Sequence, residues 1–122
     1  MPSLKSFAYA ACITSLGSFA AWADGTGAEG HIRIFNSTPG FTITGFYTNA
    51  GRGWTRDWLK DVTLTPGEGA TAKFRSAPPV CHQHVRAGWL SASGHEFKGH
   101  PVQVNICNVS NIYFAQEETY FD

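Results

Sequence analysis

Beyond residue 30 the chain consists of short runs in which polar and apolar side chains alternate, with turn-forming residues between them. In 31–35, for example, Ile32 and Ile34 alternate with His31 and Arg33. This period of two gives each strand one apolar face, which only a second layer can bury. No stretch shows the period of 3.6 residues that a long helix requires. About seven short strands therefore predict an all-β fold, a small antiparallel β-sandwich that is either Ig-like or a small barrel.

The expected strands are short and follow one another along the whole domain. They span residues 31–35, 41–47, 70–75, 81–89, 95–98, 102–107 and 111–115. Turn residues over 36–40 predict that the first two strands form a hairpin, and Pro66-Gly67 predicts a type II turn. The side chains expected in the core are Ile32, Ile34, Ile43, Val85, Val102, Val104 and Ile106.

The first 23 residues have the pattern of a secretory signal peptide. Lys5 precedes an uncharged run, rich in Ala, Phe, Leu and Ile, that closes on Ala21-Trp22-Ala23. A basic start, a short apolar run and a small-x-small end are typical of such signals. A transmembrane anchor is one alternative, although the run falls short of the roughly 18 strongly apolar residues that spanning requires. Lipidation at Cys12 is another.

These boundaries predict three segments: a signal peptide over 1–23, a flexible leader over 24–30 and one β-sandwich domain over 31–122. The leader is expected to be flexible because it holds three glycines and no apolar side chain larger than Ala. A chain processed in this way is secreted or periplasmic and does not insert into a membrane.

Charge argues against one large class of partners. The chain has 9 Lys plus Arg and 9 Asp plus Glu, and only Lys5 lies in the signal, so the processed chain has a net charge of 8 − 9 = −1. Nucleic-acid binding depends on a basic surface that neutralises phosphates, so it is not expected. The same balance gives no attraction to an anionic membrane.

Cys81 and Cys107 are the only cysteines that remain after signal removal. In an oxidising compartment such a pair normally forms a disulfide. The bridge would close a loop of roughly 27 residues and add about 3 to 4 kcal/mol of stability in the chain-entropy model. A redox-active pair is the alternative, but such pairs are usually closely spaced, as in C-x-x-C.

A pair of histidines suggests a metal site. His82 and His84 occupy alternate positions of one expected strand, so both imidazoles project from the same face, about 7 Å apart along the chain. With a third ligand from His95, His100 or Asp122, they would chelate Zn²⁺ or Cu²⁺. The alternative is a solvated strand face that binds no metal.

Aromatic and basic residues cluster in the segment that follows the second strand. Tyr47, Arg52, Trp54 and Arg56 are candidates for a ligand surface, because flat rings stack on sugar faces and Trp and Arg are enriched in binding hot spots. The alternative is that these rings fill the core, with Trp58 closing one end of the sandwich.

No motif in the chain indicates catalysis. The sequence contains no G-x-S-x-G, no H-E-x-x-H, no phosphate-binding loop and no dinucleotide fingerprint. We therefore expect no catalytic residues, no enzyme activity and no cofactor. Asn36 and Asn108 both begin an N-x-S/T sequence, which is a glycosylation acceptor only in a host that uses it.

Several short pieces carry a resemblance to a known group of proteins. They are Phe35-Asn36-Ser37-Thr38, Ile43 with Phe46-Tyr47, Trp54 with Asp57 and Leu59, Leu64-Thr65-Pro66-Gly67, Cys81 with Val85-Arg86, and Val104-Asn105-Ile106-Cys107. In these pieces the chain resembles a family of small secreted bacterial all-β domains of unknown function. The resemblance implies a secreted β-domain with a bridge from Cys81 to Cys107, and it transfers no activity.

Together these features predict a secreted or periplasmic interaction module that is not catalytic. Its expected partner is an envelope protein or a glycan, because loops on a rigid sandwich are where recognition usually occurs. The alternative function is a periplasmic Zn²⁺ or Cu²⁺ binding protein that uses the His82-x-His84 strand.

Overall fold

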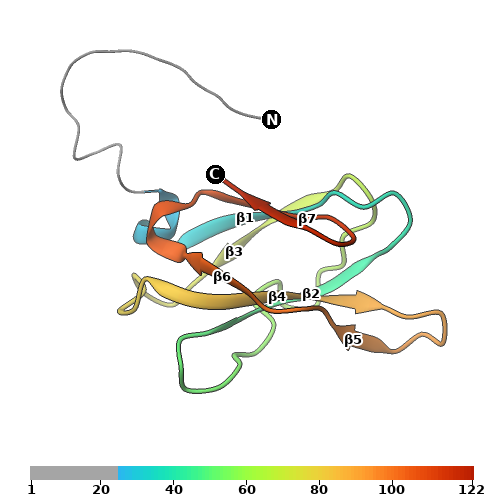
Figure 1. Cartoon of the computed structure of the whole chain (residues 1–122), viewed down its shortest axis with the longest axis horizontal. Helices are drawn as coiled ribbons and strands as arrows, with labels where there is room; N and C mark the ends of the chain where they lie inside the picture. The colour runs from blue at the N-terminus through green and yellow to red at the C-terminus, as the bar shows by residue number, and fades with distance from the viewer. Residues whose placement is uncertain (1–24) are drawn as a thin grey trace, which may run out of the picture.

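The computed structural model describes residues 25–122, which form two four-stranded sheets (Figure 1). The predicted signal peptide over 1–23 lies outside these residues. Sheet A contains, in spatial order, β3 (Gly69–Lys73), β1 (His31–Asn36), β7 (Asn111–Phe114) and β8 (Thr119–Phe121). Sheet B contains β2 (Ile43–Asn49), β4 (His82–Leu90), and, on the other side of β4, β5 (Glu96–Lys98) and β6 (Val102–Asn105).

The two sheets confirm the predicted all-β sandwich, with eight strands. They do not close on each other, so the small-barrel alternative is wrong. The sandwich is also not purely antiparallel, because β1 pairs in parallel with β7, with Arg33 opposite Asn111. β5 and β6 follow one another along β4: β6 pairs with its first half and β5 with its last three residues.

The expected hairpin between the first two strands is wrong, because β1 and β2 belong to different sheets. The buried side chain of Asn36 holds the crossover between them. Its Nδ2 donates to the carbonyls of Phe41 at 2.7 Å and Leu64 at 2.8 Å, and its Oδ1 accepts from the Thr38 N–H at 3.0 Å. A side chain bonded in this way inside the protein is not a glycosylation acceptor.

The core lies between the sheets and follows the alternation of the sequence. Six of the seven predicted core side chains are almost completely buried, and Val102 is half-buried at one border of the core. Phe46, which is fully buried, meets Phe114 of the opposite sheet at a centroid distance of 6.0 Å. Fully burying such side chains stabilises the fold by about 1.5–3 kcal/mol each.

The predicted type II turn at Pro66-Gly67 is confirmed. The Glu68 N–H donates to the Thr65 carbonyl at 3.0 Å, and Gly67 has a φ of 87°, as the third position of a type II turn requires. Trp58 and Leu59 lie in the turn that follows β2, where Leu59 is buried and Trp58 packs edge-on against Phe74 at 4.9 Å. Trp58 therefore covers one border of the sandwich, as the core-filling interpretation expected.

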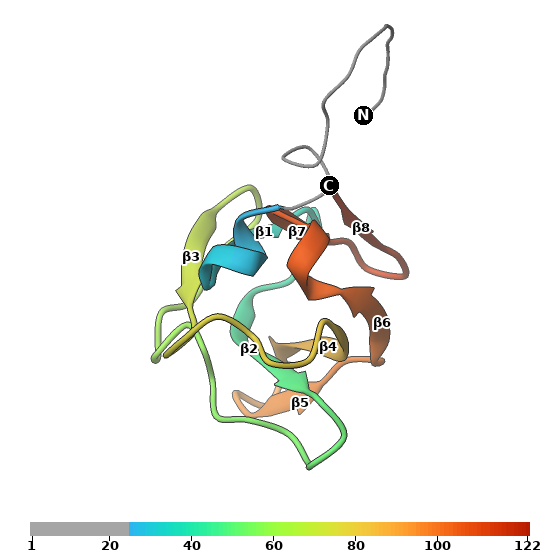
Figure 2. The ribbon, with the colours of Figure 1, turned by 90° about the vertical axis from the view of Figure 1, so that its left-hand side faces the viewer.

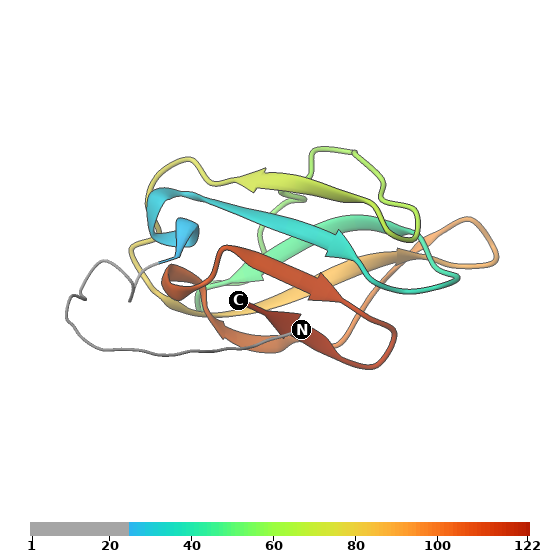
Figure 3. The ribbon, with the colours of Figure 1, turned by 90° about the horizontal axis from the view of Figure 1, so that it is seen from above.

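One end of the sandwich, which we call the closed end, is sealed by two 3₁₀ turns and a disulfide (Figure 2). The turns are η2 (Thr26–Glu29) and η3 (Ile106–Asn108). The predicted bridge joins Cys81 to Cys107, with Cα atoms 5.2 Å apart, and so ties η3 to the start of β4. Figure 3 shows η2 and η3 at this end and the β4–β5 hairpin at the other.

The flexible leader expected over 24–30 is wrong for its described residues, because η2 packs against η3. The Gly25 N–H donates to the Cys107 carbonyl, and the Gly27 N–H donates to the Val109 carbonyl, both at 2.9 Å. A Cβ at Gly27 would lie 1.8 Å from the Ile106 carbonyl oxygen. The glycines therefore permit close approach of the η2 and η3 backbones. In this segment they allow packing and do not make the chain flexible.

Candidate functional site

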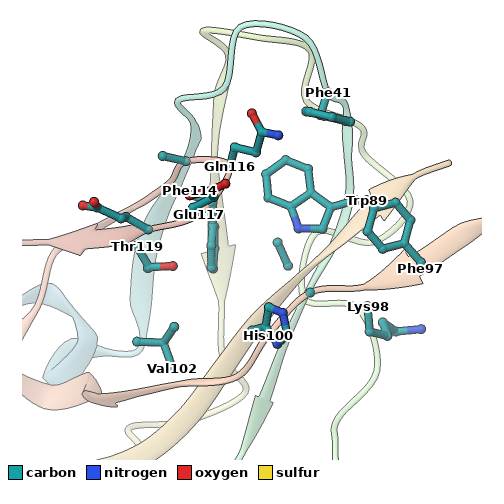
Figure 4. Close-up of a pocket in the computed structure, with 14 residues that line it drawn as sticks. Phe41, Trp89, Phe97, Lys98, His100, Val102, Phe114, Gln116, Glu117 and Thr119 are labelled. Carbon is teal, nitrogen blue, oxygen red and sulfur yellow. The ribbon is translucent and has the colours of Figure 1, made fainter.

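A cleft of about 420 Å³ opens between the sheets at the end opposite the closed end (Figure 4). One wall is the inner face of sheet B near β5, and the other is the hairpin that joins β7 to β8. The side chains that line it include Phe41, Trp89, Phe97, Val102 and Phe114. A volume of this size and an apolar lining are typical of sites for small ligands or side chains.

The cleft exists because sheet B extends beyond the cover that sheet A provides. Phe97 lies opposite Trp89 in the β4–β5 register, so both side chains belong to the inner face. Trp89 is only 9% exposed, whereas Phe97 is 48% exposed and Phe41 is 39% exposed. Phe41 and Trp89 meet edge-on at a centroid distance of 6.4 Å. An apolar face that would normally be buried is thus accessible to a ligand.

A polar group lies within this apolar lining. The indole Nε1 of Trp89 has no hydrogen-bond acceptor among the described residues, and a Cβ at Gly99 would lie 2.8 Å from it. Glycine at position 99 therefore allows the backbone to pass close to the indole N–H. In Figure 4 the indole nitrogen lies on the side of the ring toward His100. A ligand with a carbonyl or hydroxyl oxygen would find a donor at this point.

Basic and acidic side chains lie along the two borders of the cleft. Lys98 and His100 lie on the sheet B side, and Glu117 and Glu118 lie on the hairpin between β7 and β8. The Lys98 Nζ is 2.9 Å from Oε1 of Glu96, which is the one ion pair in the part of the chain that the structure describes. The acidic border has no comparable cation there.

The ligand surface predicted from the sequence is a different region, the outer face of sheet B. The structure brings Tyr47 and Trp54 to this face, but the cation between them is Arg86, whose Cζ lies 3.9 Å from the centroid of the Trp54 ring. Arg52 and Arg56 are both exposed on the loop and have no ion pair among the described residues. Two of the four predicted residues, Tyr47 and Trp54, therefore share a surface. The arginine that contacts them is Arg86 and not Arg52 or Arg56.

A carboxylate lies at the centre of the polar contacts on this outer face. Glu96 accepts hydrogen bonds from the Tyr47 hydroxyl at 2.7 Å and the Thr44 hydroxyl at 2.6 Å, besides its ion pair with Lys98. Desolvation raises the pKa of Glu96, but these donors outweigh it and hold the pKa below its usual value. Burial, together with the carboxylate, raises the pKa of Tyr47.

Glycine makes room for this network across β4. A Cβ at Gly88 would lie 2.2 Å from Oε2 of Glu96, and a Cβ at Gly45 would lie 2.5 Å from the Tyr47 hydroxyl. The side chains of β2 and β5 can therefore meet over the strand that separates them. The alternation of residues in β4 is sufficient to place Arg86 on this face from the sequence alone. No local sequence pattern indicates that Thr44 and Tyr47 of β2 contact Glu96.

The structure does not assemble the predicted metal site. His82 and His84 are exposed on one face of β4, as expected, with Asn105 and Gln103 opposite them on β6. His95 follows the other end of β4, roughly 20 Å away at the rise of a strand. His100 and Asp122 do not join the pair either, and no group of three or more His, Cys, Asp or Glu suited to a metal occurs among the described residues.

Comparisons of the chain with protein-family models, with curated proteins and with solved structures found no match. The resemblance to small secreted bacterial domains stays a prediction from the sequence. No helix in the described part of the chain is long and apolar enough to cross a membrane.

Proposed function

We propose that this chain is an exported, non-catalytic binding module, and that the cleft is its ligand site. The observation that carries the proposal is the aromatic inner face of sheet B, which the cleft of about 420 Å³ leaves open around Trp89 and Phe97. Exposed apolar surface of this kind is costly in water, so its presence beside a well-packed core points to a partner. The partner is an envelope protein or a glycan.

Export is supported by two independent features. The sequence of the first 23 residues has the pattern of a signal peptide, and the Cys81–Cys107 disulfide fits an oxidising compartment. The proposed location is therefore the periplasm or the medium outside the cell.

The chemistry of the cleft favours a ligand with an aromatic or branched apolar group and one hydrogen-bond acceptor. The group would contact Trp89, Phe97 and Phe41, and the acceptor would bind the free indole N–H. A peptide side chain with its own backbone carbonyl has both parts. A sugar ring matches less well, because its hydroxyls would meet mostly apolar walls.

A titration with N-acetylphenylalaninamide tests this proposal. In ¹⁵N-labelled protein, the Nε1–H resonance of Trp89 should shift with ligand and saturate, while the indole resonances of Trp54 and Trp58 stay in place. Phe97→Ala should weaken binding at least about fivefold, because a well-packed aromatic contact contributes about 1 kcal/mol or more. Val62→Ala is a matched control, since Val62 is exposed and does not border the cleft. An unmoved Trp89 resonance at saturating probe would overturn the proposal.

A further inference from the structure

β8 forms an edge of sheet A and directs unpaired backbone groups away from the sandwich. Asn111 and Asp122 exchange two hydrogen bonds, at 3.0 and 3.1 Å, and Ala115 donates to the Glu118 carbonyl at 2.9 Å. In an antiparallel ladder the residues between these pairs point their N–H and C=O groups the other way. Thr119 and Phe121 are those residues, and their backbone groups have no partner among the described residues.

The side chains of the same two residues face the opening between the sheets. Thr119 lies opposite Phe114, and Phe121 lies opposite Ile112, both of which are buried in the core. Phe121 nevertheless remains 44% exposed, because no further strand covers it. Thr119 also borders the cleft. A strand added beside β8 would pair with the free backbone groups and place alternate side chains over Phe121 and into the cleft.

The charge along this edge indicates what kind of strand it accepts. Residues 116–122 include Glu117, Glu118 and Asp122 and contain no Lys or Arg. None of the three carboxylates forms an ion pair in the part of the chain that the structure describes. Opposite charges on neighbouring strands stabilise pairing and like charges oppose it. Antiparallel pairing of β8 with a second copy of itself would bring Glu118 close to Asp122, so self-association is disfavoured.

We infer that the partner is an extended peptide segment of another protein, with alternating apolar and basic residues, which adds as a strand to β8. This inference rests on the proposed function of the cleft and names the occupant. The backbone groups of Thr119 and Phe121 bind the main chain of the peptide, the cleft takes its apolar side chains, and the acidic edge pairs with its lysines or arginines. The β5 edge lacks this acidic character, because Glu96 and Lys98 neutralise one another there.

The test uses a synthetic seven-residue peptide, acetylated and amidated at its ends, that alternates Lys with Val and Phe. Binding should slow amide hydrogen exchange at Thr119 and Phe121 at least about tenfold. Two control peptides carry the same apolar residues: one has Glu in place of Lys, and the other is N-methylated at alternate residues on the pairing edge. Both should bind at least about tenfold more weakly than the Lys peptide.

A pair of variants at one position separates backbone pairing from side-chain contact. Thr119→Pro removes the outward N–H, which makes no bond within the protein, and proline is tolerated at such edge positions. Thr119→Ala removes the side chain and keeps the N–H. Thr119→Pro should weaken the Lys peptide at least about fivefold relative to Thr119→Ala, while thermal unfolding shows that both variants fold.

The outcomes distinguish this inference from the function on which it rests. If N-acetylphenylalaninamide shifts Trp89 but the exchange of Thr119 and Phe121 is unchanged by peptide, the strand addition is wrong and the cleft remains a ligand site. Equal binding of the Lys and Glu peptides would contradict the preference for a basic peptide. Equal binding of the Lys peptide by Thr119→Pro and Thr119→Ala would contradict backbone pairing at Thr119. If the small probe leaves the Trp89 resonance unmoved, the ligand site is wrong and the inference that rests on it fails too.

Discussion

The two ends of the sandwich differ in how far their apolar side chains are covered. At the closed end a disulfide, two 3₁₀ turns and closely approaching glycine backbones hold the segments of the chain together. At the cleft end the inner face of sheet B continues past its cover, and Phe97 and Phe41 remain accessible. Because the closed end and the core provide stability, the other end can leave apolar surface open without unfolding the domain.

Among changes at the two ends of the sandwich, removal of the disulfide should have the largest effect on stability. The Cys81→Ala, Cys107→Ala double variant loses a cross-link between residues 26 positions apart, which should lower the free energy of unfolding by about 3 kcal/mol. Urea unfolding measures the change, and the parent protein treated with a reducing agent should agree with the variant. A midpoint equal to that of the oxidised parent would show that the closed end does not depend on the bridge.

Gly27→Ala should come next, because it pushes η2 away from the Ile106 carbonyl. Loss of the two backbone hydrogen bonds that dock this turn should cost about 2 kcal/mol. Gly40→Ala is the matched control, since a Cβ there would meet nothing within 4 Å. Thermal unfolding should place the control at or slightly above the parent, because alanine restricts the unfolded chain. If the two variants unfolded at the same temperature, docking of η2 would contribute nothing.

A smaller change in the free energy of unfolding should accompany protonation of Glu96, at the base of the β4–β5 hairpin. Because hydrogen bonds from Thr44, Tyr47 and Lys98 lower the folded pKa of Glu96, their stabilisation is present above the ordinary value near 4.5 and is lost as pH falls through the lowered pKa. Partial exposure limits the loss to under about 1 kcal/mol. The difference in unfolding free energy between the parent and Glu96→Gln should shrink as the solution is acidified. A difference that stays constant with pH would show that the hydrogen bonds to ionised Glu96 do not stabilise the fold.

The smallest effect on stability should come from the cleft. Phe97→Ala removes a half-exposed ring and should change the free energy of unfolding by no more than about 0.5 kcal/mol. Phe46→Ala, in the core, should cost about 3–5 kcal/mol. Urea unfolding of the two variants measures this contrast directly. A large loss for Phe97→Ala would mean that the ring serves packing and that the cleft is a by-product of the fold.

Alternation in the sequence was sufficient to predict most strands and nearly the whole core, because burial of one strand face is a local property of the pattern. It could not predict which strands pair. The segment that follows β1 has ordinary turn residues, and only the bonds from Asn36 to the distant Leu64 carbonyl and to Phe41 show that it crosses between the sheets. The sequence also did not predict β8, since three residues between carboxylates carry too short a pattern to recognise.

The disulfide could be predicted because the expected removal of Cys12 with the signal peptide leaves only two cysteines to pair. The cleft could not, because its lining comes from four separate parts of the chain and depends on how far one sheet extends past the other. Its one visible signal was the run from Phe97 to His100, which places aromatic, basic and glycine residues together. The predicted histidine site failed for a related reason, since spacing fixes His82 and His84 on one face but does not say where a third ligand lies.

The parallel pairing of β1 with β7 has a consequence for the order in which the molecule can be made. β1 is an inner strand of its sheet, yet Arg33 bonds to Asn111, 78 positions later. Contacts between such distant parts of a chain slow folding, because the intervening segment must be ordered before they form. One edge of β1 therefore stays unpaired until β7 has been synthesised. The centre of sheet A can form only when these two distant strands are both present.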